Sequence, residues 1–116
     1  MTTVLIVDDH PAFRTSVRHL LEAEGFAVVG EAEDGRSALE QIATLAPDLV
    51  LLDIQLPDID GFAVAAELRR RGDGPKIVLT SSREEGDYGA RIAESGARGF
   101  VPKGELSGAA IDQLIG

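Results

Sequence analysis

Three carboxylates stand where two short apolar runs of the sequence end. Asp8 and Asp9 follow the run at 4–7, and Asp53 follows the run at 49–52. If these side chains lie together, they repel one another and raise one another's pKa unless a cation neutralises them. The chain has no Cys and only two His, so the ligands of such a cation would be oxygen atoms. That donor set, in an open and partly hydrated site, favours the hard ion Mg²⁺.

Hydroxyl groups and a lysine follow two further apolar runs. Thr80, Ser81 and Ser82 follow one of them, and Lys103 follows the other. Mg²⁺ beside a free carboxylate and an ammonium group is suited to phosphoryl transfer, because both cations offset the charge on the phosphoryl oxygens while a carboxylate acts as nucleophile. Each residue alone has an ordinary alternative, such as an Asp that caps a helix. Three carboxylates, a hydroxyl and an ammonium group that all follow apolar runs are together hard to explain as separate caps and turns.

The surrounding pattern predicts elements that would bring these residues together. Short aliphatic runs alternate five times with stretches of helical periodicity, and Pro11 and Gly25 mark the start and the end of the first helix. The expected strands are 4–7, 26–30, 49–52, 76–80 and 98–101, and the other expected helices are 37–46, 62–71, 84–95 and 106–115. This alternation predicts an α/β protein with a doubly wound, five-stranded parallel sheet, (βα)5. In such sheets the site lies at the carboxyl ends of the strands.

Length and charge exclude several classes of protein. The 116 residues have the size of one domain, 1–116, and their net charge is −9. So acidic a domain is a poor binder of nucleic acid or of an anionic membrane. The absence of Cys rules out a disulfide scaffold and thiolate metal sites. No apolar run is long enough to span a membrane and no signal peptide is recognisable, so we expect a cytoplasmic protein.

Three stretches of the sequence match one known family. They are Val-Leu-Ile-Val-Asp-Asp-His-Pro at 4–11, Leu-Leu-Asp-Ile-Gln-Leu-Pro-Asp-Ile-Asp-Gly at 51–61 and Gly-Ala-Arg-Gly-Phe-Val-Pro-Lys at 96–103. Through them the chain resembles the receiver domain of two-component response regulators over essentially its whole length. The resemblance implies a flavodoxin-like fold with strand order 2-1-3-4-5. It also implies Mg²⁺ as cofactor and a sensor histidine kinase as partner in a phosphorelay.

The resemblance assigns roles to the residues at the strand ends. Asp53 matches the phosphoacceptor, which takes a phosphoryl group from the kinase's phosphohistidine and later loses it to water. Asp9 and Asp53 match direct Mg²⁺ ligands, together with the backbone carbonyl of Gln55, whereas Asp8 matches the acid that acts mostly through metal-bound water. Lys103 matches the lysine that contacts the phosphoryl oxygens. His10, beside the acidic pair, is interpreted as a loop residue near the site, the alternative being a group that contacts the metal ligands without binding the metal.

A hydroxyl and an aromatic residue match the family's conformational switch. Ser81 lies 22 residues before the lysine, as the family commonly has it, and Thr80 is the alternative. Phe100 matches the aromatic partner, although plain packing in the core also explains an aromatic residue there. Gln55 and Arg83, two positions after the acceptor and after the hydroxyl, match positions that modulate the lifetime of the phosphorylated state.

Two departures from the family pattern concern the last third of the chain. Gly104 follows the lysine, where relatives often have Pro. Gly86 and Gly89 fall in the expected helix 84–95, and each lowers its helical propensity by up to about 1 kcal/mol. We therefore expect this helix to be the least stable of the five. Phosphorylation should change the face that it forms with the neighbouring strand and the last helix, a face that is also a candidate for a phosphorylation-dependent dimer.

Three functions remain open from the sequence. Because the chain ends at Gly116, just after the last expected helix, a stand-alone phosphoacceptor switch is the first. The second is the receiver half of a regulator with a helix-turn-helix output domain, since 8–14 resembles the start of such proteins. The third is an aspartate-nucleophile phosphohydrolase, which needs Asp-x-Asp, and Asp8-Asp9-His10 does not supply it. In the first two the domain is no enzyme beyond its own phosphorylation and dephosphorylation.

Overall fold

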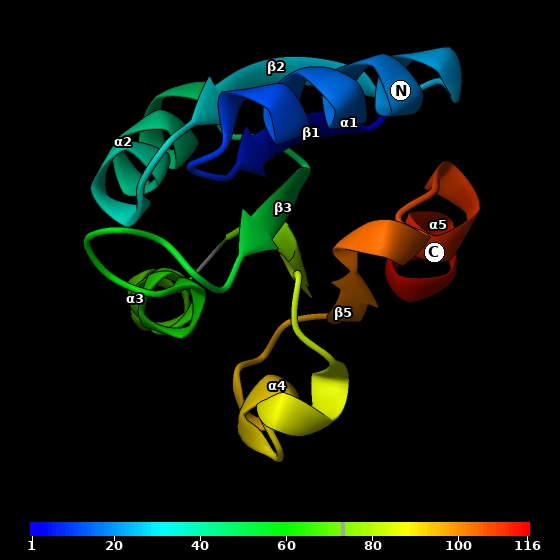
Figure 1. The fold of residues 1–116 in the computed structure, drawn as a ribbon. Coiled ribbons are helices and arrows are strands. Elements are labelled where there is room, and N and C mark those ends of the chain that lie inside the picture. Colours follow the sequence, from blue (N-terminus) through cyan, green and yellow to red (C-terminus); the bar gives the residue numbers. More distant parts are fainter. Residues whose placement is uncertain (73) are drawn as a thin grey trace.

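The alternating pattern produces a five-stranded parallel sheet in the computed structural model (Figure 1), which describes residues 1–72 and 74–116. The strand order is β2-β1-β3-β4-β5, which confirms the predicted topology. The strands are β1 (Thr3–Val7), β2 (Ala27–Ala32), β3 (Leu49–Asp53), β4 (Lys76–Ser81) and β5 (Gly99–Pro102). Because all neighbouring pairs are parallel, the carboxyl ends of the strands meet at one edge.

Helices cover both faces of the sheet, as expected of a doubly wound fold (Figure 1). They are α1 (Pro11–Ala23), α2 (Gly35–Leu45), α3 (Gly61–Arg71), α4 (Arg91–Glu94) and α5 (Gly108–Ile115), with short 3-10 turns η1 (Glu85–Asp87) and η2 (Lys103–Glu105). The side chains of α1 and α5 join one core cluster, and those of α2, α3 and α4 join the other. Among the described residues, no helix has the length and apolar character needed to span a bilayer.

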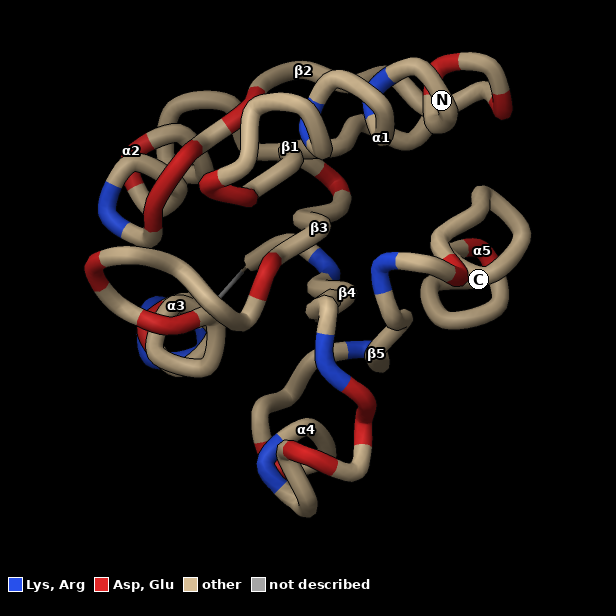
Figure 2. The backbone as a smooth tube through the Cα atoms, in the orientation of Figure 1, with Lys and Arg blue, Asp and Glu red and all other residues tan. Residues whose placement is uncertain are grey.

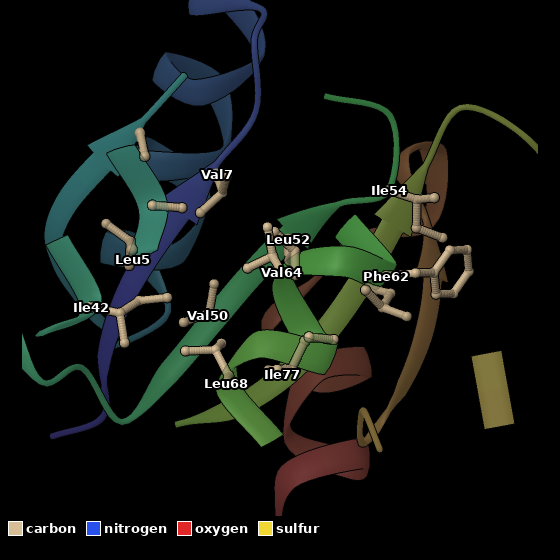
Figure 3. Packing of buried hydrophobic residues seen from close by; sticks show 14 of the residues in the cluster. Leu5, Val7, Ile42, Val50, Leu52, Ile54, Phe62, Val64, Leu68 and Ile77 are labelled. Atoms are coloured by element: carbon tan, nitrogen blue, oxygen red, sulfur yellow. The ribbon is translucent and has the colours of Figure 1, made fainter. Parts of the chain in front are cut away.

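The central strands β1 and β3 are apolar throughout 4–7 and 49–52 because both of their faces are buried there. One core takes alternate residues of β1 and β3 together with side chains of α2 and α3, as Figure 3 shows for Leu5, Val7, Ile42, Val50, Leu52, Val64 and Leu68. The opposite core takes Val4, Ile6, Leu49 and Leu51 together with Val17, Leu21 and Ile111. This double burial holds the strand ends, and hence the polar residues that follow them, in fixed positions.

Side-chain caps fix where three helices begin. Asp34, Asp60 and Ser107 accept hydrogen bonds from backbone N–H groups in the first turns of α2, α3 and α5. These bonds satisfy donors that have no partner inside the helix, each stabilising it by typically about 1 kcal/mol. They also set the start of each helix relative to the strand end before it.

The predicted helix 84–95 is wrong in extent. The segment contains only the turn η1 and the four residues of α4. Gly89 between them has φ +60°, which lies outside the right-handed helical region. A capping box between Glu84 and Asp87 fixes the start of η1.

Candidate functional site

The sheet brings the predicted carboxylates together. Val7 pairs with Leu52 in the register of β1 and β3, so Asp8 and Asp53 follow neighbouring strands at the same level. Asp8, Asp9, His10 and Asp53 each place one potential ligand atom within 4.8 Å of the others. Figure 2 shows the acidic segments of the β1–α1 loop and of the end of β3 at this edge of the sheet.

Lys103 forms ion pairs with two members of this cluster, Asp8 and Asp53. Its Nζ is 2.7 Å from Asp8 Oδ2 and 3.2 Å from Asp53 Oδ2. The ammonium group also lies 4.4 Å from the centre of the Phe13 ring, within range of a cation–π interaction. Burial alone would lower the pKa of Lys103, but the carboxylates of Asp8 and Asp53 outweigh it and raise this pKa. The lysine is therefore a fixed positive charge between two buried carboxylates.

Asp53 is almost wholly buried at the end of the central strand. Its pKa is raised to about 6, chiefly by burial and further by the nearby Asp8, against the lowering effects of Lys103 and of the backbone N–H of Gln55, which donates to Oδ1 at 3.0 Å. The carboxylate is thus ionised above neutral pH at a cost in free energy. An added cation would relieve that cost.

The two members of the acidic pair differ in their surroundings. Asp8 is fully buried, accepts a hydrogen bond from the backbone N–H of His10 at 2.8 Å and forms an ion pair with Lys103. The side chain of Asp9 is 36% exposed, and its Oδ1 lies 3.1 Å from His10 Nδ1. His10 Nδ1 is also 3.1 Å from Asp8 Oδ1, so this largely exposed side chain contacts both acids of the pair. The oxygen atoms of Asp9 and Asp53 fit a hard, partly hydrated cation.

Two arginines that sequence reasoning missed hold the loop that carries the acidic pair. Arg14 Nη1 donates to the carbonyl oxygen of Asp8 at 2.6 Å, and Arg14 Nε donates to Glu31 Oε1 at 2.9 Å. Arg18 Nε donates to the other oxygen of Glu31 at 2.8 Å. The bond from Arg18 is the largest of the influences that lower the pKa of Glu31. The spacing of four residues between two basic side chains on α1 was the only signal in the sequence.

The loop after Asp53 is fastened at two points. The carboxylate of Asp58 accepts hydrogen bonds from the backbone N–H groups of Gly35 at 2.8 Å and Arg36 at 3.0 Å, at the start of α2. The N–H of Gly61 donates to the carbonyl of Ile54 at 2.8 Å. A Cβ atom on Gly61 would lie 2.6 Å from the carbonyl oxygen of Asp53, so this position has no room for a side chain.

The two candidate switch hydroxyls make different bonds, although both residues are fully buried. Thr80 Oγ1 donates to the carbonyl oxygen of Val101 at 2.7 Å, which ties it to β5. Ser81 Oγ lies 2.6 Å from the hydroxyl of Tyr88 and accepts from the N–H of Arg83 at 3.1 Å. Tyr88 was not identified from the sequence.

The aromatic residue predicted for the switch lies in the core beside Tyr88. Phe100 is buried, and its ring centre is 6.0 Å from that of Tyr88. On its other side the Tyr88 ring meets Phe62, at 5.7 Å between ring centres. The side chains of the two predicted lifetime modulators, Gln55 and Arg83, are exposed. Their backbone N–H groups donate to the side chains of Asp53 and Ser81 respectively.

Comparisons with known proteins agree with this arrangement. Residues 4–114 match the model of the response regulator receiver domain. A protein of Pseudomonas aeruginosa predicted to be a transcriptional regulator is 44% identical over 105 residues, which cover 90% of this chain and 51% of that protein. The chain spans about half the length of the curated relatives it matches.

Solved structures share the fold at higher coverage. The signal receiver domain of NarL from Mycobacterium tuberculosis is 38% identical with a TM-score of 0.86, over 99% of this chain and 97% of that one. TrrA from Thermotoga maritima, solved in complex with Mg(2+)-BeF, is 30% identical with a TM-score of 0.82, over 98% and 99% of the two chains. With its acidic cluster at the predicted strand ends, the chain therefore belongs to the response regulator receiver domain family.

Proposed function

We propose that this receiver domain accepts a phosphoryl group on Asp53 from the phosphohistidine of a sensor histidine kinase. The observation that carries the proposal is the pairing of a buried Asp53 with the ammonium group of Lys103, 3.2 Å away, beside a second carboxylate. The fold alone does not require a half-buried lysine between two acids. A site for a phosphoryl group does, because the lysine offsets the charge on the phosphoryl oxygens.

The transfer is a displacement at phosphorus. A carboxylate oxygen of Asp53 attacks the phosphorus atom, the phosphorus–nitrogen bond breaks, and the imidazole nitrogen keeps its electron pair. The product is an acyl phosphate on Asp53. Lys103 lies close enough to Asp53 to offset the negative charge on the phosphoryl oxygens, and the N–H of Gln55 holds the carboxylate in place.

Mg²⁺ is the cation that these residues would hold. Asp9, Asp53 and the backbone carbonyl of Gln55 are the proposed direct ligands, and Asp8 is proposed to act through bound water. The carboxylate oxygens within 4.8 Å of one another support this set. When bound, the ion would neutralise charge on the carboxylates and on the incoming phosphoryl group.

The deciding experiment measures the intact mass of the purified domain after incubation with acetyl phosphate. In the presence of Mg²⁺ we expect the mass of one added phosphate, and peptide mapping should locate it on Asp53. The same incubation with EDTA in place of Mg²⁺ should leave the mass unchanged. Failure of the Mg²⁺ sample to gain mass would reject the proposal.

Mg²⁺ affinity should depend on Asp9 more than on Asp8. Asp9 is partly exposed and free to contact an ion, whereas Asp8 is buried and already paired with Lys103. The Asp9→Ala variant should therefore weaken Mg²⁺ binding more than Asp8→Ala, as measured by calorimetric titration. Asp112→Ala, an exposed acid of α5, serves as the control. The opposite order would contradict the ligand assignment.

The lifetime of the phosphorylated state should depend on Gln55 and Arg83. Both side chains are exposed on segments that bind Asp53 and Ser81, so their bulk can block an attacking water. Loss of phosphate, followed by mass, should be faster in the Gln55→Ala/Arg83→Ala double variant than in the wild type. Arg98→Ala/Gln113→Ala removes the same residue types from exposed positions elsewhere and should decay like the wild type. Equal decay in both double variants would mean that these side chains shield nothing.

The length of the relatives favours a second candidate role for the domain as a whole. The Pseudomonas aeruginosa relative is predicted to regulate transcription, and the chain matches only 51% of it. On this reading residues 1–116 are the receiver half of a cytoplasmic DNA-binding regulator, rather than a stand-alone switch. The mass of the native protein, purified from its own host, distinguishes the two. A phosphorylation-dependent dimer through the face of α4, β5 and α5 stays a prediction, both for a stand-alone switch and for the receiver half of a larger regulator.

A further inference from the structure

The hydroxyl of Ser81 forms a hydrogen bond with Tyr88 rather than with a residue of the proposed phosphorylation site. Its Oγ lies 2.6 Å from the Tyr88 hydroxyl, on the side of the aromatic cluster that Tyr88 forms with Phe62 and Phe100. Among the hydrogen bonds of residues 1–72 and 74–116, Ser81 Oγ has none to Asp53 or Lys103. The hydroxyl is therefore already engaged before any phosphoryl group arrives.

Ser81 is fully buried, so its hydroxyl needs a partner in each state of the protein. Phosphoryl oxygens only accept hydrogen bonds, and to reach them the Oγ must turn toward Asp53. Rotation about χ1 moves Oγ between staggered positions about 120° apart. The short contact with Tyr88 cannot survive that rotation.

We propose that Tyr88 is a positioning residue of the switch, whose hydroxyl competes with the phosphoryl group for Ser81. This inference rests on the proposed phosphorylation of Asp53 and goes beyond it. Tyr88 stabilises the unphosphorylated arrangement, and its release couples the segment of η1 and α4 to the state of Asp53. The segment is suited to such movement, because it holds only a 3-10 turn and four helical residues.

The contacts of the Tyr88 ring allow its hydroxyl to be tested separately from its packing in the core. The ring lies between Phe62 and Phe100, and Arg91 covers the Phe62 ring at 4.2 Å. A Tyr88→Phe change keeps these ring contacts and removes only the hydroxyl. Ser81 then loses a partner in the unphosphorylated state, which should favour the bound state by about three- to tenfold, the size of one hydrogen bond.

The test is calorimetric titration of beryllium fluoride, a mimic of the phosphoryl group, into the domain saturated with Mg²⁺. Tyr88→Phe should bind it about three- to tenfold more tightly than the wild type, with an unchanged affinity for Mg²⁺. In the Ser81→Ala background the same Tyr88→Phe change should have no effect on binding, since the competition no longer exists. Because the chain has one Tyr and no Trp, the emission of Tyr88 should also change when beryllium fluoride binds the wild type.

The outcomes are distinct. Equal or weaker binding by Tyr88→Phe would overturn the competition, and weaker binding would mean that Tyr88 supports Ser81 in the bound state. An unchanged Tyr88 emission at saturating beryllium fluoride would equally exclude a release of this side chain. If the wild type neither binds the mimic nor gains phosphate mass, the proposed function itself is wrong and the inference falls with it.

Discussion

In the Asp53→Asn variant the addition of phosphate by acetyl phosphate should disappear completely, while the unphosphorylated domain becomes more stable. The loss follows because an amide is no nucleophile and Asp53 ends the central strand beside Lys103. The gain follows because the wild-type carboxylate is buried close to Asp8 and must share the ammonium group of Lys103 with it. This single substitution is thus expected to remove phosphorylation and to raise the free energy of unfolding.

The gain in stability should depend on pH. Burial raises the pKa of Asp53 from 3.8 to about 6, so between these values the folded domain holds a proton that the unfolded chain has lost. The contribution of this group to stability is therefore greatest below the lower value and declines as the pH rises through about 6. After a discount for solvent at the mouth of the site, Asp53→Asn should stabilise by about 1–2 kcal/mol at neutral pH and above.

Urea denaturation in EDTA measures this difference. The Asp53→Asn gain should shrink toward zero as the pH is lowered to about 4. Mg²⁺ should reduce it at neutral pH, since the ion stabilises only the wild-type carboxylate. Asp112→Asn, on the exposed side of α5, is the matched control. A phosphate retained by Asp53→Asn, or a stability gain that does not vary with pH, would contradict this account of the site.

Gly61→Ala should damage both the fold and the acceptor. The new Cβ would lie 2.6 Å from the carbonyl oxygen of Asp53 and 2.8 Å from Ile54 Cα. Both neighbours are backbone atoms, so relief requires the acceptor segment to move. We expect a loss of about 1–3 kcal/mol in the free energy of unfolding, the range of an overpacked core position. Phosphorylation by acetyl phosphate should slow as well, because Asp53 and the carbonyl of Gln55 shift with the loop.

Gly86→Ala provides the comparison. A Cβ there meets nothing within 4 Å, and no positive φ constrains the residue. Its unfolding free energy should stay within about 0.5 kcal/mol of the wild type, as for an exposed surface change. If Gly61→Ala were as stable as Gly86→Ala, the close approach of α3 to the acceptor loop would not be a constraint on the protein.

Most of the fold could be predicted because its signals are local. Continuous apolar runs with β-branched residues mark strands buried on both faces, and their parallel arrangement places Asp8 and Asp53 at one edge. The helix at 84–95 was predicted too long, because Ile92 and its apolar neighbours match a helical period while Gly89 adopts a positive φ. Tyr88, Arg14 and Glu31 escaped prediction for a different reason. Their partners are distant in the sequence or depend on the path of an irregular segment.

The ion pairs of the site have a consequence for how the domain responds to its surroundings. Asp8 and Asp53 share the ammonium group of Lys103, and Asp9 lies beside them, so the three carboxylates leave two excess negative charges above the pKa of Asp53. A divalent cation balances that excess, whereas a monovalent ion leaves the pocket negative toward an approaching phosphoryl anion. If Asp53 accepts a phosphoryl group as proposed, we expect the domain to respond only when a phosphodonor and a divalent cation are present together, because a phosphodonor alone meets electrostatic repulsion.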